Sequence, residues 1–410
     1  MTFISVCAVV IFLATYFVMA VGRLPGFQID RAGAALLGAA LMVGIGVLTP
    51  SDAFAAIDAA TIALLLGMMV VVANLRLSGF FRLVTAWVTR HAHHPLLLLA
   101  GIVLVTGVLS AFLVNDAVCL AVTPLVCHVM LRLRRDPVPY LLAVAMASNA
   151  GSVATITGNP QNMIVGSLSG IPYLHFALAL APVAVASLVV VWAVIVVSHR
   201  DEFLGPAPDI GVDGGPIVYH SGLVIKSVVV LGLMVVAFFL GAPVAEVAVL
   251  GGAYLLLTRR VKPAKVYTLI DWPLLVMFAG LFVVVAGLEK AVLGPQAVAA
   301  IGNLNLASVP ILSAVTVALS QLVSNVPAVL VLRPFMAPLK EPAHAWLVVA
   351  MASTLAGNLT IVGSVANLIV VQQAKSAGVA ILFWRYFAVG APVTLITLVI
   401  GIAWLSWGVS

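Results

Sequence analysis

Two segments of the chain interrupt long apolar stretches with hydroxyl, amide and glycine residues. The first, TITGNPQNMIVG, begins at Thr155, and the second, TIVGSVANLIVV, begins 205 positions later at Thr360. Glycine, threonine and proline are unfavourable inside a helix, and non-helical backbone is tolerated at membrane depth only where protein buries it or a polar cavity adjoins it. Oxygen atoms of hydroxyl, amide and carbonyl groups can bind a cation or a hydroxylated solute. The two segments therefore predict a binding site for a small solute.

The composition excludes an ordinary soluble protein. Apolar residues make up 64% of the 410 residues and charged residues 8%, whereas soluble domains carry roughly 25% charged residues. Apolar stretches of about 18 residues or more, each long enough to cross a bilayer core of roughly 30 Å, recur along the chain. We expect an integral membrane protein that does not bind nucleic acid, because its basic residues lie in short loops between apolar stretches.

Each of the two segments is predicted to end one helix and begin another. Asn159 followed by Pro160 is a typical helix start, and Ser364 occupies the corresponding position in the second segment. The N-terminus of a helix carries free N–H groups and roughly half a positive charge, which favours anions. The alternative is that the small residues only permit close helix packing. The candidate binding residues are Thr155, Thr157, Gly158, Asn159 and Asn162 in the first segment and Thr360, Gly363, Ser364 and Asn367 in the second.

Two further apolar stretches, residues 95–131 and 309–338, are interrupted midway by polar residues. The interruptions are Asn115-Asp116 and Ser324-Asn325. We predict two re-entrant hairpins whose tips reach the middle of the membrane and join the site. Asp116 has about twenty apolar residues on each side, and an ionisable residue inside a membrane is a functional candidate by default. Burial favours its neutral form, so Asp116 is the candidate for proton coupling, whereas a bound Na⁺ would keep it ionised. The alternative is a helix cap.

Charge predicts how the chain crosses the membrane. The predicted spans are ten segments: residues 3–22, 31–49, 59–76, 138–169, 172–198, 218–240, 243–258, 268–288, 343–373 and 383–408. Lys and Arg concentrate in cytoplasmic loops. An N-terminus outside the cell places all 19 basic residues except Lys290, Arg333 and Lys340 on the cytoplasmic side. We expect a multi-pass protein of the inner (plasma) membrane with both termini outside.

The two halves of the chain repeat the same features in the same order. Residues 1–200 contain hairpin 95–131 and broken helix 138–169, and residues 218–410 contain hairpin 309–338 and broken helix 343–373; residues 201–217 form a cytoplasmic linker. Each half has an odd number of spans, so the second is inverted relative to the first. We predict an all-α polytopic membrane protein with two inverted-topology repeats, an architecture typical of secondary transporters.

Five other charged residues in or beside apolar stretches are expected to have structural roles or to be solvated. Asp58 and Asp271 match across the repeat, and each precedes a helix that it is expected to cap. Arg333 is expected to be paired or to extend toward the membrane surface, and Glu246 and Glu289 are expected to be solvated at the outer ends of spans.

The order of hairpin tip and broken helix resembles the ion transporter superfamily. This superfamily contains arsenite permeases, sodium/proton antiporters of the NhaD type, citrate-metal symporters and divalent anion/sodium symporters. LVNDAVCLAVTP, from Leu113, resembles the Asn-Asp tip of arsenite permeases and related anion permeases, and LTIVGSVANLIV, from Leu359, is similar to their second broken helix. The resemblance implies an elevator motion, in which hairpins and broken helices form a transport subdomain that moves against a scaffold, and it implies a homodimer.

The resemblance also narrows the expected substrate. The dicarboxylate branch has Ser-Asn-Thr at both tips, whereas this chain has Asp116 and Val326 in place of the two threonines. A fixed carboxylate at the site repels a dianion. We expect a proton-coupled permease for a small oxyanion or its neutral acid, with arsenite or antimonite favoured. The alternatives are a sodium/proton antiporter and a Na⁺-coupled di- or tricarboxylate symporter.

No enzymatic motif accompanies these features. The sequence contains no HExxH, GxSxG or Walker motif. We therefore expect no enzyme activity, no cofactor and no resident metal. An ATPase partner is expected only if the chain belongs to an arsenite pump, and membrane lipids are its other expected partners.

Overall fold

The protein is a bundle of helices. The computed structural model describes residues 3–22, 28–91, 94–204, 218–258, 260–292 and 305–407, and within these ranges it contains α-helices, two short 3-10 helices and no strands. The first half contains α1 (Phe3–Val21), α2 (Arg31–Gly44), α3 (Pro50–Ala56), α4 (Ala59–Ser78), α5 (Phe80–His91), α6 (Pro95–Phe112), α7 (Asn115–Arg132), α8 (Pro137–Ser152), η1 (Ile156–Gly158), α9 (Pro160–Ser169), α10 (Tyr173–Ser198) and α11 (Arg200–Leu204).

The second half presents a corresponding series of helices. It contains α12 (Ser221–Phe239), α13 (Val244–Leu256), α14 (Pro263–Tyr267), α15 (Trp272–Val292), α17 (Val309–Val323), α18 (Asn325–Met336), α19 (Pro342–Ala356), η3 (Ile361–Gly363), α20 (Val365–Ser376) and α21 (Phe383–Trp407). α11 covers the start of the predicted linker 201–217, and the rest of that segment lies outside the described residues.

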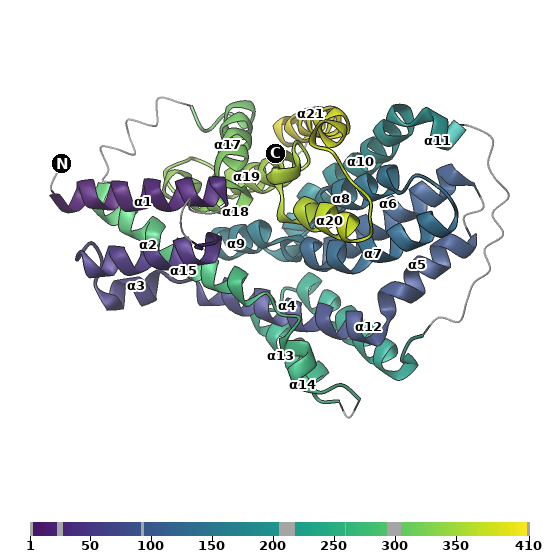
Figure 1. The fold of residues 1–410 in the computed structure, drawn as a ribbon. Helices are drawn as coiled ribbons and strands as arrows, with labels where there is room; N and C mark the ends of the chain where they lie inside the picture. Colours follow the sequence, from purple (N-terminus) through teal and green to yellow (C-terminus); the bar gives the residue numbers. More distant parts are fainter. Residues whose placement is uncertain are drawn as a thin grey trace.

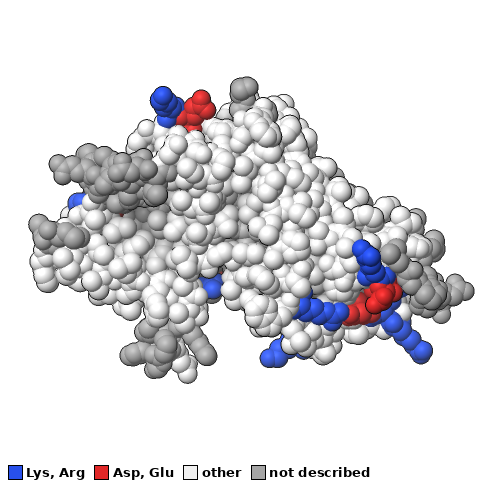
Figure 2. All heavy atoms as spheres, turned by 90° about the horizontal axis from the view of Figure 1, so that it is seen from above, with Lys and Arg blue, Asp and Glu red and all other residues white. Residues whose placement is uncertain are grey.

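The described helices identify an integral, multi-pass membrane protein. Eight of them are long and apolar enough to cross a membrane, namely α1, α4, α6, α7, α10, α12, α15 and α21. On the face seen in Figure 2, charged side chains gather toward the two ends of the molecule and leave a broad band between them almost free of charge. This band is what a bilayer core requires, because burying a charge in hydrocarbon is costly.

The ten predicted spans correspond to three kinds of element. Six are the single long helices α1, α4, α10, α12, α15 and α21, and two are the shorter helices α2 and α13. The spans 138–169 and 343–373 are each divided into two helices, as predicted. Each arm of the first hairpin is itself 18 residues long, enough to cross the membrane, so its re-entrant path stays a prediction.

Helices of one half pack against matched helices of the other half. α4 packs along α13, and α15 packs along α2. Both pairs approach closely at a glycine: a Cβ added to Gly67 would lie 2.5 Å from the backbone carbon of Ala248, and one added to Gly280 would lie 2.6 Å from that of Ala35. Gly67 and Gly280 are 213 positions apart in the sequence, and so are the residues that they face, Ala35 and Ala248. The two contacts are therefore equivalent, which supports the predicted repeat.

The hairpins and broken helices form a layer of their own. In Figure 1 this layer, α6 to α10 with α17 to α21, lies above α4, α12 and α13, whereas α1, α2 and α15 lie toward the left of it. The hairpin α17–α18 lies toward the left of the layer and the hairpin α6–α7 toward the right. We call α1, α2, α4, α12, α13 and α15 the scaffold helices. The two hairpins thus approach the broken helices from opposite ends of the molecule.

Candidate functional site

Both helix breaks occur where the sequence predicts them. Asn159 caps α9, and its Oδ1 accepts a hydrogen bond from the backbone N–H of Asn162 at 2.8 Å. Ser364 occupies the N-cap position of α20 without a side-chain capping bond. A Cβ added to Gly158 would lie 2.3 Å from the carbonyl oxygen of Ser152. Only glycine therefore fits the return of the chain in the first break.

One asparagine in each half holds its break together. Asn162 Nδ2 donates to the carbonyl oxygens of Ser152 and Thr155, both at 3.0 Å. Asn367 Nδ2 donates to those of Gly357 at 2.6 Å and Thr360 at 3.0 Å. These carbonyls lack helical partners because the helix is interrupted, and a buried carbonyl without a partner is costly. The two side chains therefore stabilise the breaks, and their amide nitrogens are occupied by protein.

The hydroxyl groups of the breaks are also bonded to protein. Thr155 Oγ1 donates to the carbonyl oxygen of Ala111 in the first hairpin, and Thr157 Oγ1 lies 2.9 Å from the Tyr173 hydroxyl. In the second half, Thr360 Oγ1 donates to Gln321 Oε1 at 3.2 Å. Thr155 and Thr360 thus connect each break to the first arm of the hairpin in the same half.

Two residues that sequence reasoning missed link the halves. Asn149 Nδ2 donates to Asn358 Oδ1 at 2.9 Å and to Asn367 Oδ1 at 3.1 Å. Thr354 Oγ1 accepts from Asn159 Nδ2 and Gln161 Nε2, both at 3.2 Å. Asn149 and Thr354 are 205 positions apart, like the two breaks. This spacing, shortly before each break, was a signal in the sequence that could have identified them.

The hairpin tips dock against the same network. Asn115, the first residue of α7, donates from Nδ2 to Asn149 Oδ1 at 3.1 Å. Asn325 begins α18, and its amide, oriented with the nitrogen toward neighbouring carbonyls, donates to Ser353 at 3.1 Å and Gly363 at 3.2 Å. Ser324 adopts a left-handed conformation, with φ 77°, that turns the chain sharply between α17 and α18. The tips of both hairpins are therefore fixed beside the breaks.

A cavity of about 550 Å³ lies where the tips, the second break, the start of α9 and the scaffold helices meet. Of the 13 residues predicted for the site, the cavity is lined by Asn115, Asp116, Ser324, Asn325 and Ser364. The other eight belong to the framework around it and do not line it: Thr155, Thr157, Gly158, Asn159, Asn162, Thr360, Gly363 and Asn367. Pro160 and Gln161, which directly follow the first break, line the cavity as well, so the structure brings the tips together with both breaks and gives most of the predicted break residues a supporting position.

Three carboxylates line this cavity, and each faces the N-terminus of a helix. Asp30 Oδ1 accepts from the N–H of Gly33 at 2.8 Å in α2, and Asp271 Oδ1 accepts from the N–H of Leu274 at 3.0 Å in α15. Asp116 is half-buried, faces the N–H of Ala366 in the first turn of α20, and interacts electrostatically with Asp271. Each helix terminus offsets roughly half a negative charge.

Asp271 is a helix cap, as predicted, and it also belongs to the cavity, which was not predicted. Its counterpart Asp58 caps α4, with Oδ1 accepting from the N–H of Thr61 at 2.8 Å. Arg333 lies 3.9 Å from Glu289, so the prediction of a paired arginine is confirmed. Glu289 is correspondingly a partner of Arg333 rather than a freely solvated residue.

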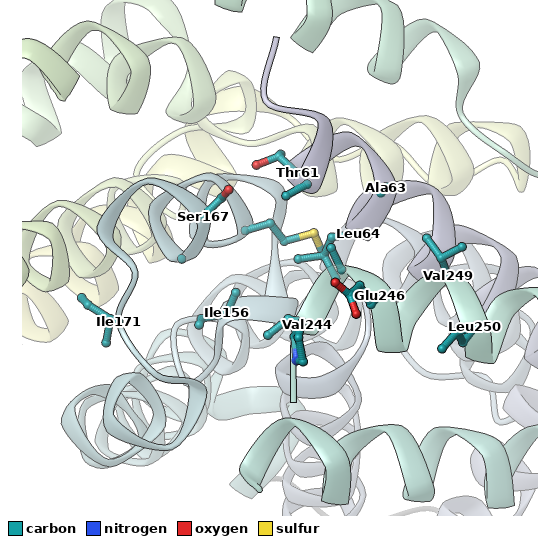
Figure 3. A pocket seen from close by; sticks show the side chains of 15 residues that line it. Thr61, Ala63, Leu64, Ile156, Ser167, Ile171, Val244, Glu246, Val249 and Leu250 are labelled. Atoms are coloured by element: carbon teal, nitrogen blue, oxygen red, sulfur yellow. The ribbon is translucent and has the colours of Figure 1, made fainter. Parts of the chain in front are cut away.

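A second cavity, of about 700 Å³, lies between α4, α9 and α13. Its walls are mostly apolar, and Figure 3 shows the side chains of Glu246, Thr61 and Ser167 as its polar exceptions. The second cavity is larger but contains neither hairpin tip. We therefore assign the candidate site to the cavity lined by Asp116.

The chain resembles known proteins along almost its whole length. The model of a protein family described as citrate transporter matches residues 10–356. The chain is 32% identical to a 46 kDa membrane protein of Mycobacterium leprae over 96% of both chains. It is 30% identical to the silicon efflux transporter LSI3 of Oryza sativa subsp. japonica over 92% of this chain and 93% of that protein. In fold it is similar to the Alcanivorax borkumensis YdaH transporter, with a TM-score of 0.59, 15% identity, and coverage of 100% of this chain and 99% of that one.

Proposed function

The chain belongs to the citrate transporter family within the ion transporter superfamily, and on this premise we propose that it is a proton-coupled permease for a small oxyanion or its neutral acid. Family membership makes it a secondary transporter rather than an enzyme. The substrate and the coupling ion are our proposal, with arsenite or antimonite as the first compounds to test.

The observation that carries this proposal is the cavity in which both hairpin tips meet the second broken helix. Polar groups from both halves, among them Asn115, Asp116, Asn325 and Ser364, converge there inside an otherwise apolar chain. Intramembrane ionisable residues mark substrate or proton pathways by default, and interrupted helices supply substrate sites in many transporters. An elevator motion would carry this group of residues past the scaffold helices.

The charges in the cavity favour a substrate with little negative charge. Asp30, Asp116 and Asp271 line it together with one cation, Arg31. A di- or tricarboxylate would be repelled unless the carboxylates were neutralised. The similarity to a silicon efflux transporter supports the same choice, because silicon dissolves as a neutral oxyacid, as trivalent arsenic does.

A Na⁺-coupled di- or tricarboxylate symporter is the second candidate. The family description as citrate transporter is the observation in its favour. Na⁺ would find oxygen ligands in the same cavity, and its charge would keep Asp116 ionised. A sodium/proton antiporter would use the same residues without a second solute.

The orientation of the protein in the membrane and its partners are also part of our proposal. We place the protein in the inner membrane with both termini outside, because this orientation keeps most basic residues on the cytoplasmic side. We further propose a homodimer, as in related transporters, and an ATPase partner only for an arsenite pump.

Transport in reconstituted vesicles tests the function. Uptake of arsenite, citrate and Na⁺ would be measured separately under imposed pH and Na⁺ gradients. We expect a pH gradient to drive arsenite uptake, and Asp116→Asn to abolish uphill movement while exchange at equal concentrations persists. Normal accumulation by the Asp116→Asn protein would refute the role of Asp116, and citrate uptake driven by Na⁺ would favour the second candidate.

A further inference from the structure

The two cavities occupy equivalent positions in the two halves of the scaffold. Lining residues of the two cavities correspond at an offset of 213 positions in the sequence. Ala60, Thr61 and Leu64 of the second cavity correspond to Pro273, Leu274 and Met277 of the first. In the same way, Asp30, Arg31 and Ala32 of the first cavity correspond to Pro243, Val244 and Ala245 of the second. Because the scaffold helices pack as matched pairs, the two cavities are the two faces that an inverted repeat would present on opposite sides of the membrane.

Arg31 distinguishes the first cavity from the second. It is half-buried in the cavity wall, and within the described ranges it makes no hydrogen bond or ion pair. The three carboxylates of the cavity face helix N-termini instead. A partly buried guanidinium without a partner is costly, so Arg31 is poised to bind an anionic group.

A second unpartnered group lines the same cavity. Asn115 is 3% exposed, and its Oδ1 has no hydrogen-bond partner among the described residues. The orientation of this amide is fixed, because Asn115 Nδ2 donates to Asn149 Oδ1, and Asn149 Nδ2 donates to Asn358 and Asn367. Asn115 Oδ1 therefore requires a donor, which a substrate hydroxyl would supply.

We propose that Arg31 binds the charged oxygen of a partly protonated oxyanion, whose hydroxyl donates to Asn115 Oδ1. This binding occurs only while the site opens to the side of the membrane on which Arg31 lies, which we call the Arg31 face. This inference rests on the proposed function and narrows its substrate to a molecule with both O–H and O⁻ groups. A guanidinium binds such an oxygen more strongly than a neutral group does.

The charges of the cavity permit this binding when Asp116 carries a proton. The N-termini of α2, α15 and α20, each with roughly half a positive charge, face Asp30, Asp271 and Asp116 respectively. With Asp116 neutral, these termini and Arg31 offset the two remaining carboxylates. One proton and one monoanion would then enter together.

The second cavity lacks this cation. The position equivalent to Arg31 is Val244, and Figure 3 shows the Glu246 carboxylate among the apolar side chains of that cavity. A fixed negative charge there disfavours the anion. The two faces should therefore differ in apparent affinity for the anion, with the tighter binding on the Arg31 side.

Transport measured from each face tests the inference. The protein would be reconstituted in phosphatidylethanolamine–phosphatidylglycerol vesicles of known orientation, and KM would be measured at one mildly acidic pH for arsenite, which is then a neutral acid, and for dihydrogen arsenate, which is a monoanion with both O–H and O⁻ groups. The control is Arg76→Gln, because Arg76 is also half-buried, makes no ion pair within the described ranges, and lies outside both cavities.

We expect Arg31→Gln to raise KM for the monoanion about tenfold or more at the Arg31 face, with less than a twofold effect at the other face and for the neutral acid. Arg31→Lys should recover part of the loss. An unchanged KM for the monoanion, or equal increases at both faces, would overturn the inference while leaving the proposed function intact. Absence of oxyanion transport by the wild-type protein would instead refute the proposed function itself.

Discussion

Replacing Asn149 by leucine should destabilise the protein more than any other single change in its buried polar network. The side chain is 1% exposed and takes part in four hydrogen bonds with residues of the first hairpin tip, the second break and α20. It accepts from Asn115 Nδ2 and Ser364 Oγ, both at 3.1 Å, and donates to Asn358 Oδ1 at 2.9 Å and Asn367 Oδ1 at 3.1 Å.

The expected magnitude follows from the partners left behind. Leucine has a similar size but no polar atoms, so four buried groups lose a partner at about 1 kcal/mol or more each. We expect a loss of about 4 kcal/mol in the free energy of unfolding, which is a large fraction of the stability of a typical protein. Because Asn115 and Ser364 line the cavity, substrate affinity should fall as well.

Asn74→Leu is the matched control. Asn74 is also buried, at 0% exposed, but it lies in α4 and bonds only locally, from Nδ2 to the carbonyl oxygen of Val70 at 2.9 Å. Its Oδ1 has no partner among the described residues, so its replacement should cost below about 1 kcal/mol. The assay is thermal unfolding in detergent, followed by tryptophan fluorescence. We expect a fall of several degrees for Asn149→Leu and little change for Asn74→Leu; equal effects would refute the role of the network.

Three further predictions address the scaffold, the protein surface and the second break. Gly280→Ala should destabilise by about 1–3 kcal/mol, because the new Cβ would meet the Ala35 backbone; an unchanged unfolding temperature would show that α2 and α15 can separate. A hydrogen bond from Lys290 lowers the pKa of Asp52, so its small stabilisation should be present at neutral pH and vanish on acidification; a difference between wild type and Asp52→Asn that grows in acid would contradict this. Asn367→Ala should reduce the free energy of unfolding by more than it reduces the free energy of substrate binding, with both measured on the same sample. A larger loss in binding than in unfolding would assign Asn367 to the substrate site.

The sequence was sufficient to predict the helices and their interruptions. Asn159-Pro160 and Ser364 marked the starts of α9 and α20 because capping depends on local residue types. The charge-free spans were equally visible, since hydropathy alone determines which helices enter a membrane. These features depend on short stretches of chain.

The partners of individual side chains were not predictable in the same way. The sequence presented Asn162 and Asn367 as ligands, yet both bond to carbonyls of their own break. It presented Asp271 only as a cap, because its place in the cavity depends on the packing of α15 against the hairpin tip. Arg31 lies nearly 300 residues from Ser324, and only the folded chain brings them into one cavity.

The tip of the first hairpin and the second broken helix share one cavity. A cavity of this volume is about 10 Å across if it is round. Cysteines introduced as Asp116→Cys and Ser364→Cys, in a chain without its three native cysteines, should therefore be joined by a short bifunctional thiol reagent, and mass spectrometry should detect the linked peptides. Asp116→Cys paired with Trp384→Cys, whose position is exposed on α21, should not be joined. Full reaction of each single cysteine without any link between positions 116 and 364 would contradict the account.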